Sequence, residues 1–196
     1  MTNTIEEIAG TDFIIALGTN TTETHPIISL KVRKALNNGA GLVVADPRKT
    51  EIAELANIHL QHQSGSDLAL LNAMAHVIIA EDLYNKDFIQ DRTEGFTEFK
   101  EAVKRYTPEY AAEITGLNPD DIREAARGYA KAENAMILYT MGITQHICGT
   151  DNVLAIANLA LLTGHIGRAH NGVCPLRGQN NVQGACDMGA LPDVYP

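Results

Sequence analysis

Three short segments of the chain are almost entirely apolar, and each ends at a glycine or a proline. They are DFIIALG (12–18), GLVVADP (41–47) and AMILYTMG (135–142). Apolar runs of this length are typical of strands buried on both faces, as in a parallel sheet. A shorter segment, NIHLQ (57–61), is predicted to be a further strand. The pattern therefore indicates a parallel sheet with covered faces.

Apolar residues recur at helical spacing between these segments. Residues 26–38 form such a pattern, with Pro26 in the first turn and Gly39 near the end. A second helix is predicted to begin at Ser66 or Asp67, which are suitable N-cap residues.

The rest of the chain adds short helices and then loses its periodicity. Residues 84–131 are predicted to form several short helices, the clearest of them capped by Asn118. A last helix is predicted from Thr150 or Asp151 to Gly164 or Gly167. From residue 168 onward glycine, asparagine and proline interrupt every period, so a long C-terminal loop is expected. The predicted fold is α/β: a Rossmann-like parallel sheet flanked by helices, with a helical insert at about 84–131. We expect an α/β domain over residues 1–170 and an active-site loop over 171–196.

Composition excludes several classes of function. The formal net charge of −9 leaves no basic surface for nucleic acid, and no segment is long and apolar enough to span a membrane. The three cysteines are scattered without a CxxC pair, which predicts reduced thiols and a cytoplasmic location. The seven histidines show no metal-ligand spacing, so no metal ligand is assigned. GxGxxG, GxSxG, HExxH and Walker motifs are absent.

The predicted strand ends supply candidate ligand-binding residues, because open α/β sheets bind ligands beyond the carboxyl ends of their strands. Polar or glycine-containing segments follow each predicted strand, and a loop of small residues before a helix suits a phosphate. Asp46 could also accept hydrogen bonds from the base edge of a guanine. These segments are 18–20, 46–49, 63–67 and 141–145.

The segment PLRGQNNVQGACDMG (175–189) places many hydrogen-bonding side chains and three glycines in a region with little to build a core. It resembles a signature of the large catalytic subunit of molybdopterin-dependent formate dehydrogenases. GTNTTETHPIIS, VVADPRKTEIAELANIHL, MGITQH and LALLTGHIGRAHNGVCPLRGQNNVQGACDMGALPDVYP resemble that family in the same order.

The resemblance implies an inner cofactor-binding domain of a longer subunit. Its cofactor is molybdopterin guanine dinucleotide (bis-MGD) with molybdenum or tungsten, and the strand ends would hold the guanosine diphosphate part of one pterin. It implies that Arg177 binds and orients formate beside the metal, where a planar guanidinium can hold a carboxylate with directional hydrogen bonds. The implied cofactor-binding residues are Gly18, Thr19, Asn20, His25, Asp46, Arg48, Gly65, Asp67, Met141, Gly142, Gln145, Gly178 and Gln179.

Other features of the family are missing from this sequence. They are the cysteine motif for a 4Fe-4S cluster, the metal-ligating selenocysteine or cysteine with its histidine, and the C-terminal domain over the cofactors. The chain is therefore expected to be part of a longer oxidoreductase, inactive alone, whose partners are the rest of the subunit, electron-transfer subunits and formate. Two alternatives stay open: another molybdopterin oxidoreductase such as a nitrate reductase, and a non-catalytic nucleotide-binding module.

Overall fold

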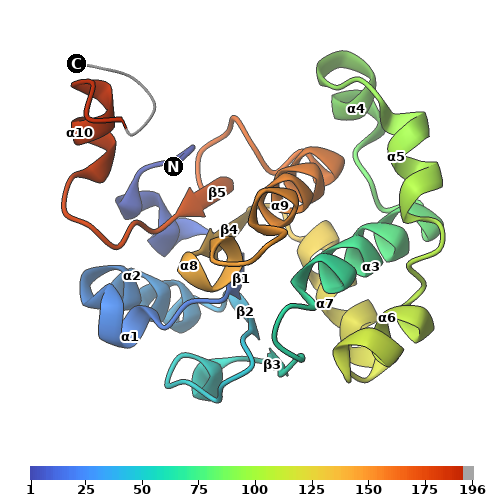
Figure 1. Ribbon diagram of the computed structural model, residues 1–196, viewed down its shortest axis with the longest axis horizontal. Coiled ribbons are helices and arrows are strands. Elements are labelled where there is room, and N and C mark those ends of the chain that lie inside the picture. The colour runs from blue at the N-terminus through green and yellow to red at the C-terminus, as the bar shows by residue number, and fades with distance from the viewer. Residues whose placement is uncertain (192–196) are drawn as a thin grey trace.

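The computed structural model, which describes residues 1–191, contains a five-stranded sheet in the order β3-β2-β1-β4-β5, with all neighbours parallel (Figure 1). The central strand β1 lies in register with β2 on one side and β4 on the other, so that Phe13 is opposite Gly41 and Ala135. The α/β fold class predicted from the sequence is confirmed. The strands are β1 (Phe13–Leu17), β2 (Gly41–Ala45), β3 (Ile58–Leu60), β4 (Ala135–Tyr139) and β5 (Gly172–Pro175).

One face of the sheet is covered by α2 (Pro26–Asn37) and the 3-10 helix η1 (Ile5–Gly10). Pro26 occupies the first turn of α2, as predicted. Ile14 and Ala16 of β1 point into this layer and pack with Ile28 and Val32 of α2. Two short helices flank the layer, α1 (Thr21–Thr24) and η2 (Ala53–Leu55).

The other face is covered by α3 (Asp67–Ala80), α7 (Pro119–Lys131) and α9 (Gly149–Thr163). Ile15 and Leu17, which alternate with the residues of the first face, pack into this larger core. The insert predicted at 84–131 is confirmed as a series of helices, of which the last, α7, belongs to this layer. These are α4 (Lys86–Arg92), α5 (Phe96–Val103) and α6 (Pro108–Thr115), followed by α7, whose cap Asn118 accepts from the Asp120 amide at 3.0 Å.

The order of the strands reverses between β1 and β4. The chain moves outward from β1 through β2 to β3, crosses back through α3–α7, and continues on the other side with β4 and β5. At such a reversal the loops after the two central strands turn to opposite sides and leave a crevice between them. The sheet therefore places a binding crevice beyond Leu17 and Tyr139.

Several predicted boundaries differ in the structure. The last helix begins at Gly149 rather than at Thr150 or Asp151, and it ends at Gly164 with a left-handed C-cap. Ser66 precedes α3, but its hydroxyl donates to the Gln63 carbonyl at 2.6 Å and does not cap the helix. Among residues 1–191, no helix has the length and apolar character needed to cross a bilayer.

The segment expected to be a continuous C-terminal loop contains two short elements, β5 and α10 (Val182–Asp187). β5 was not predicted because GVCP is only four residues long and begins and ends with glycine and proline. Its strand conformation comes from pairing with β4 and not from the strand propensity of its own residues. The boundary predicted at 170/171 stays a prediction, although β5, which lies after it, is a strand of the same sheet. Residues 192–196 of the predicted active-site loop lie outside the described residues.

Candidate functional site

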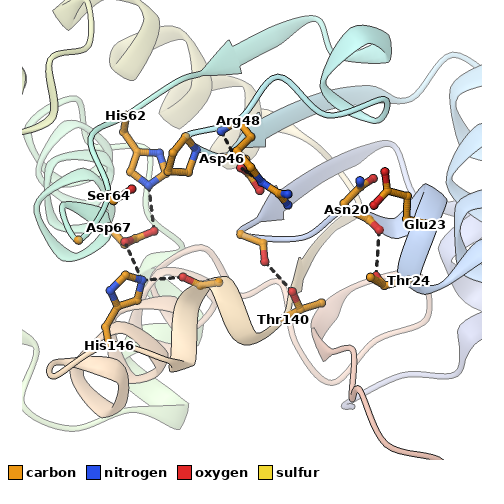
Figure 2. Close-up of a pocket in the computed structure, with 14 residues that line it drawn as sticks. Asn20, Glu23, Thr24, Asp46, Arg48, His62, Ser64, Asp67, Thr140 and His146 are labelled. Carbon is orange, nitrogen blue, oxygen red and sulfur yellow. Dashed lines mark hydrogen bonds and ion pairs between the residues drawn. The ribbon is translucent and has the colours of Figure 1, made fainter.

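A polar cleft of about 510 Å³ lies beyond the carboxyl ends of β1, β2 and β4 (Figure 2). Its volume falls in the range of small-molecule and cofactor sites. It takes residues from all four of the segments singled out in the sequence. They are Gly18, Asn20, Glu23, Thr24, Asp46, Pro47, Arg48, His62, Ser64, Gly65, Asp67, Thr140, Gly142 and His146.

The floor of the cleft is a close contact between the loops after β1 and β4. Gly18 has a φ of +51°, and a Cβ atom there would lie 2.7 Å from the carbonyl carbon of Gly142. A Cβ atom on Gly142 would lie 2.5 Å from the Gly18 oxygen. The Thr140 hydroxyl also donates to that oxygen, at 2.5 Å. Both glycines are therefore required for the two loops to approach each other this closely.

Asp46 follows β2 and is buried, with 5% of its surface exposed. Its Oδ1 accepts a hydrogen bond of 2.8 Å from the Arg48 amide, and the Arg48 side chain lies 3.8 Å from the same atom. Among residues 1–191, Oδ2 has no hydrogen-bond partner from the protein. Asp46 can therefore accept a bond from a ligand in the cleft, while the largely exposed Arg48 offers a positive charge at its edge.

Asp67 is held differently, by two histidines that sequence reasoning did not assign. His62 Nε2 lies 3.0 Å from Asp67 Oδ1, and His62 Nδ1 lies 3.2 Å from the Leu60 carbonyl. Burial alone would lower the His62 pKa, but the hydrogen bond and charge of Asp67 outweigh it, so the pKa is raised above its ordinary value. His146 Nε2 lies 3.7 Å from Asp67 Oδ2 (Figure 2). Both carboxylate oxygens thus face imidazoles.

The loop after β1 carries polar atoms that are buried without a partner. Asn20 Oδ1 and Thr19 Oγ1 form no hydrogen bond with the described residues, and the same is true of the hydroxyls of Thr21 and Thr22. A buried polar group without a partner costs free energy, and such groups are normally satisfied by protein, water or ligand. Since Asn20 lines the cleft, a polar ligand there would supply the missing partner.

The N-terminal end of α3 lies at the edge of the cleft. Ser64 and Gly65 line the cleft immediately before this 14-residue helix. Gly65 has a φ of +85°, and no atom lies within 4 Å of the position that a Cβ atom would take. Glycine is therefore favoured there by the backbone conformation of the turn and not by a steric clash. The amide groups of the first turn and the helix dipole favour an anion at this end.

A second, smaller hollow of about 130 Å³ lies beyond β4 and β5 and contains the signature arginine. Arg177 is exposed, and Met141, Gly178 and Gln179 line the same hollow. Burial raises the pKa of the neighbouring Tyr139, and the positive charge of Arg177 acts against that rise. The described residues thus place Arg177 near the cleft but outside it.

The predicted site residues fall into three groups. Gly18, Asn20, Asp46, Arg48, Gly65, Asp67 and Gly142 line the main cleft, and Met141, Arg177, Gly178 and Gln179 line the second hollow. Thr19, His25 and Gln145 line neither. Thr19 is buried, the exposed Gln145 is the C-cap of the short helix α8 (Met141–Thr144), and the His25 ring contacts the main-chain oxygen of Arg177.

The cleft residues that the sequence analysis missed are chiefly His62 and His146. The available signals were positional: His62 directly precedes the selected segment 63–67, five residues before Asp67, and His146 directly follows the selected segment 141–145. Among residues 1–191, no group of three or more His, Cys, Asp or Glu side chains is arranged to hold a metal ion.

Comparison with known proteins gives consistent results. The family model described as molybdopterin oxidoreductase matches residues 1–195. The chain is 53% identical to formate dehydrogenase H of Escherichia coli, covering all of this chain and 27% of that protein. It is also 53% identical to the F420-dependent formate dehydrogenase subunit alpha of Methanocaldococcus jannaschii, of which it covers 29%. The chain therefore spans little more than a quarter of these relatives.

A solved structure is similar as well. Acetylene hydratase from Pelobacter acetylenicus aligns with a TM-score of 0.78 and 28% identity, over 85% of this chain and 25% of that one.

Proposed function

The chain belongs to the molybdopterin oxidoreductase family, and from that premise we propose that it is the nucleotide-binding part of a formate dehydrogenase catalytic subunit. In this proposal the main cleft holds the guanosine diphosphate end of one pterin of a bis-MGD cofactor. Arg177 binds formate and orients it. The reaction of the whole enzyme is the two-electron oxidation of formate to carbon dioxide.

The observation that carries the nucleotide proposal is the cleft itself, with the buried Asn20 side-chain oxygen that lacks a partner. The surrounding residues fit a guanosine diphosphate. A guanine presents two donors, N1–H and N2–H, and Asp46 has a carboxylate oxygen available. The diphosphate needs cationic and amide donors, which Arg48 and the Ser64–Gly65 turn before α3 supply.

Asp67 has a supporting role in this proposal. Its carboxylate is hydrogen-bonded to His62, so it holds the wall of the cleft in place and balances the charge of a protonated His62. Asp46, Arg48 and Asn20 are therefore the residues that we assign to direct contact with the nucleotide. Met141, Gly178 and Gln179 line the approach toward Arg177.

Arg177 contributes to formate binding through charge and shape. Its guanidinium can donate two parallel hydrogen bonds to a carboxylate, which attracts the anion and also fixes its direction. The bound cofactor with its metal supplies the two-electron redox chemistry. The 4Fe-4S cluster, the metal ligand, the remaining cofactor contacts and the electron-transfer partners would lie in other parts of the enzyme.

The similarity to acetylene hydratase is an argument against assigning the reaction from the fold alone, since related architectures carry different chemistry. The formate assignment is supported instead by relatives at 53% identity and by the RGQNN segment. A nitrate reductase is less well supported because the relatives at 53% identity are formate dehydrogenases, and a non-catalytic module would have no use for an exposed arginine that lines the second hollow.

The nucleotide proposal can be tested with GDP as the probe. Binding of GDP to the 196-residue chain, measured by isothermal titration calorimetry, should weaken roughly tenfold or more in Asp46→Ala, because a charge-assisted hydrogen bond contributes about 1.5–3 kcal/mol. Glu124→Ala, an exposed change on α7, is the matched control. Unchanged GDP affinity in Asp46→Ala, or no binding by the parent chain, would contradict the assignment.

A further inference from the structure

His25 connects two parts of the molecule that are 152 residues apart in the sequence. Its Nε2 lies 2.8 Å from the main-chain oxygen of Arg177, and its Nδ1 lies 2.8 Å from Thr24 Oγ1. The Thr24 hydroxyl in turn donates to the Asn20 carbonyl at 2.9 Å (Figure 2). A series of polar contacts therefore connects the cleft to the arginine segment.

The geometry fixes how the ring is used. The Arg177 carbonyl can only accept, so His25 Nε2 must carry the hydrogen, in a neutral or a doubly protonated ring alike. Pro26 follows His25 and disfavours a helical backbone there, and His25 lies between α1 and α2 with φ −140° and ψ 63°. Because both ring nitrogens already have protein partners, neither is free for a cofactor.

The Arg177 segment depends on this contact. The Leu176 amide donates to the Tyr139 carbonyl at 2.8 Å and ends the pairing beside β4. Beyond it, residues 177–180 are exposed. Within the described part of the chain, the bond from His25 is the single hydrogen bond made by the main chain of these four residues.

We propose that His25 is a positioning residue that fixes the main chain of Arg177 at a set place relative to the nucleotide cleft. The proposal rests on the function proposed above, in which the arginine orients formate while the cleft holds the cofactor. It replaces direct cofactor contact, the role that the family resemblance implied for His25. If the main chain of Arg177 is held in place, its guanidinium starts from a fixed position. The guanidinium can orient formate only from such a fixed position.

Trypsin, which cleaves after Arg177, tests the tether in the 196-residue chain. His25→Phe should be cut at Arg177–Gly178 roughly fivefold faster than the parent. This is the change in the population of the open segment that the loss of one net hydrogen bond would cause. Cleavage at Arg92–Thr93 should be unchanged. His25→Gln keeps an N–H donor and should stay near the parent rate. An unchanged rate at Arg177–Gly178, or an equal rise at both bonds, overturns the tether.

A double-mutant cycle in the full-length enzyme tests the positioning role. His25→Phe should lower kcat/KM for formate several-fold without loss of bound guanine nucleotide, and it should cause no further loss in an Arg177→Ala background. His76→Gln, which removes a ring contact with the Val103 carbonyl elsewhere, is the control. An equal loss in both backgrounds overturns the proposal. If Arg177→Ala alone leaves kcat/KM intact, the proposed function fails, and the trypsin result is unaffected.

Discussion

His62 makes hydrogen bonds through both ring nitrogens, one to Asp67 Oδ1 at 3.0 Å and one to the Leu60 carbonyl at 3.2 Å. Both partners only accept, so both nitrogens carry hydrogen when both bonds form, and the ring is then an imidazolium. The same geometry raises the pKa of His62, even though burial opposes the charge. When both bonds form, His62 and Asp67 are a buried ion pair in the wall of the cleft.

This pair predicts how stability depends on pH. A raised pKa stabilises the fold fully below the ordinary histidine value near 6.5, and that contribution is lost as pH rises through the folded-state pKa. The free energy of unfolding of the chain should therefore fall, as pH rises above 6.5, more steeply than that of His62→Gln. Other groups facing His62 are Asp46 and, across Asp67, His146.

Urea denaturation followed by circular dichroism at several pH values measures this difference. At pH 6 His62→Gln should also be less stable than the parent by about 3 kcal/mol, because Asp67 loses its closest partner in a buried site. His59→Gln, on the neighbouring strand β3, serves as a control for loss of a histidine. Parallel pH profiles for the parent and His62→Gln would show that His62 is uncharged in the folded chain.

The Gly18–Gly142 contact predicts that any side chain at either position destabilises the fold. Gly18→Ala and Gly142→Ala each place a methyl group within 2.7 Å of backbone atoms, which cannot move as a flexible side chain would. Each should destabilise the fold by about 2 kcal/mol or more, the range for steric strain in a packed site. Thermal denaturation is the measurement.

Gly39→Ala is the matched control for that pair. Gly39 has a φ of +97° but no atom within 4 Å of its would-be Cβ, so the substitution adds conformational strain without a clash. We expect a cost of about 1 kcal/mol. Equal effects at Gly18 and Gly39 would indicate that backbone conformation, and not contact between the loops, requires glycine at Gly18.

Sequence reasoning identified the elements whose pattern is local. β1, β2 and β4 are continuous apolar runs, and α7 combines an N-cap, a proline at its first position and an amphipathic pattern. It could not identify β5, whose four residues form a strand only because β4 lies beside them. It also missed the start of α9, which lies at Gly149 rather than at a residue with a capping side chain.

The cleft was predicted in outline for a general reason: parallel strands bring their carboxyl ends to one edge. The roles of individual residues depended on contacts between distant segments. His146 meets Asp67 from a different loop, and His25 meets Arg177 across the molecule. No spacing in the sequence records such pairs. The cofactor contact that the family resemblance implies for His25 stays a prediction, and in the structure the His25 ring contacts the Arg177 carbonyl.

Glu7 predicts a stabilising contribution that disappears in acid. Hydrogen bonds from Asn3 and from the amides of His170 and Thr4 lower its pKa to about 2. A lowered pKa contributes stability above the ordinary value of 4.5, and that contribution is lost as pH falls toward 2. The Tm of Glu7→Gln should therefore be below that of the parent at pH 7, with a gap that narrows between pH 4.5 and pH 2.

Glu124→Gln, an exposed change on α7, provides the reference for that measurement. It removes one carboxylate without touching the contact between η1 and the segment before β5. If the Tm gap for Glu7→Gln stays constant down to pH 2, the carboxylate charge is not what holds the N-terminal segment to His170.

Arg177 gives the most direct test of the proposed chemistry. In the full-length enzyme, Arg177→Ala should retain guanine nucleotide and metal, because Arg177 lines the second hollow and not the main cleft. It should nevertheless lower kcat/KM for formate by about two orders of magnitude, since one positioned charged contact contributes about 3 kcal/mol.

Arg177→Lys should have a kcat/KM between those of Arg177→Ala and the parent, because an ammonium attracts the anion but lacks the planar fork that fixes its direction. Inhibition by azide, a small anion, should weaken in the same order. Steady-state kinetics with cofactor analysis separates the outcomes: loss of cofactor in Arg177→Ala would make the residue a cofactor anchor, and a kcat/KM within a few-fold of the parent would remove it from formate binding.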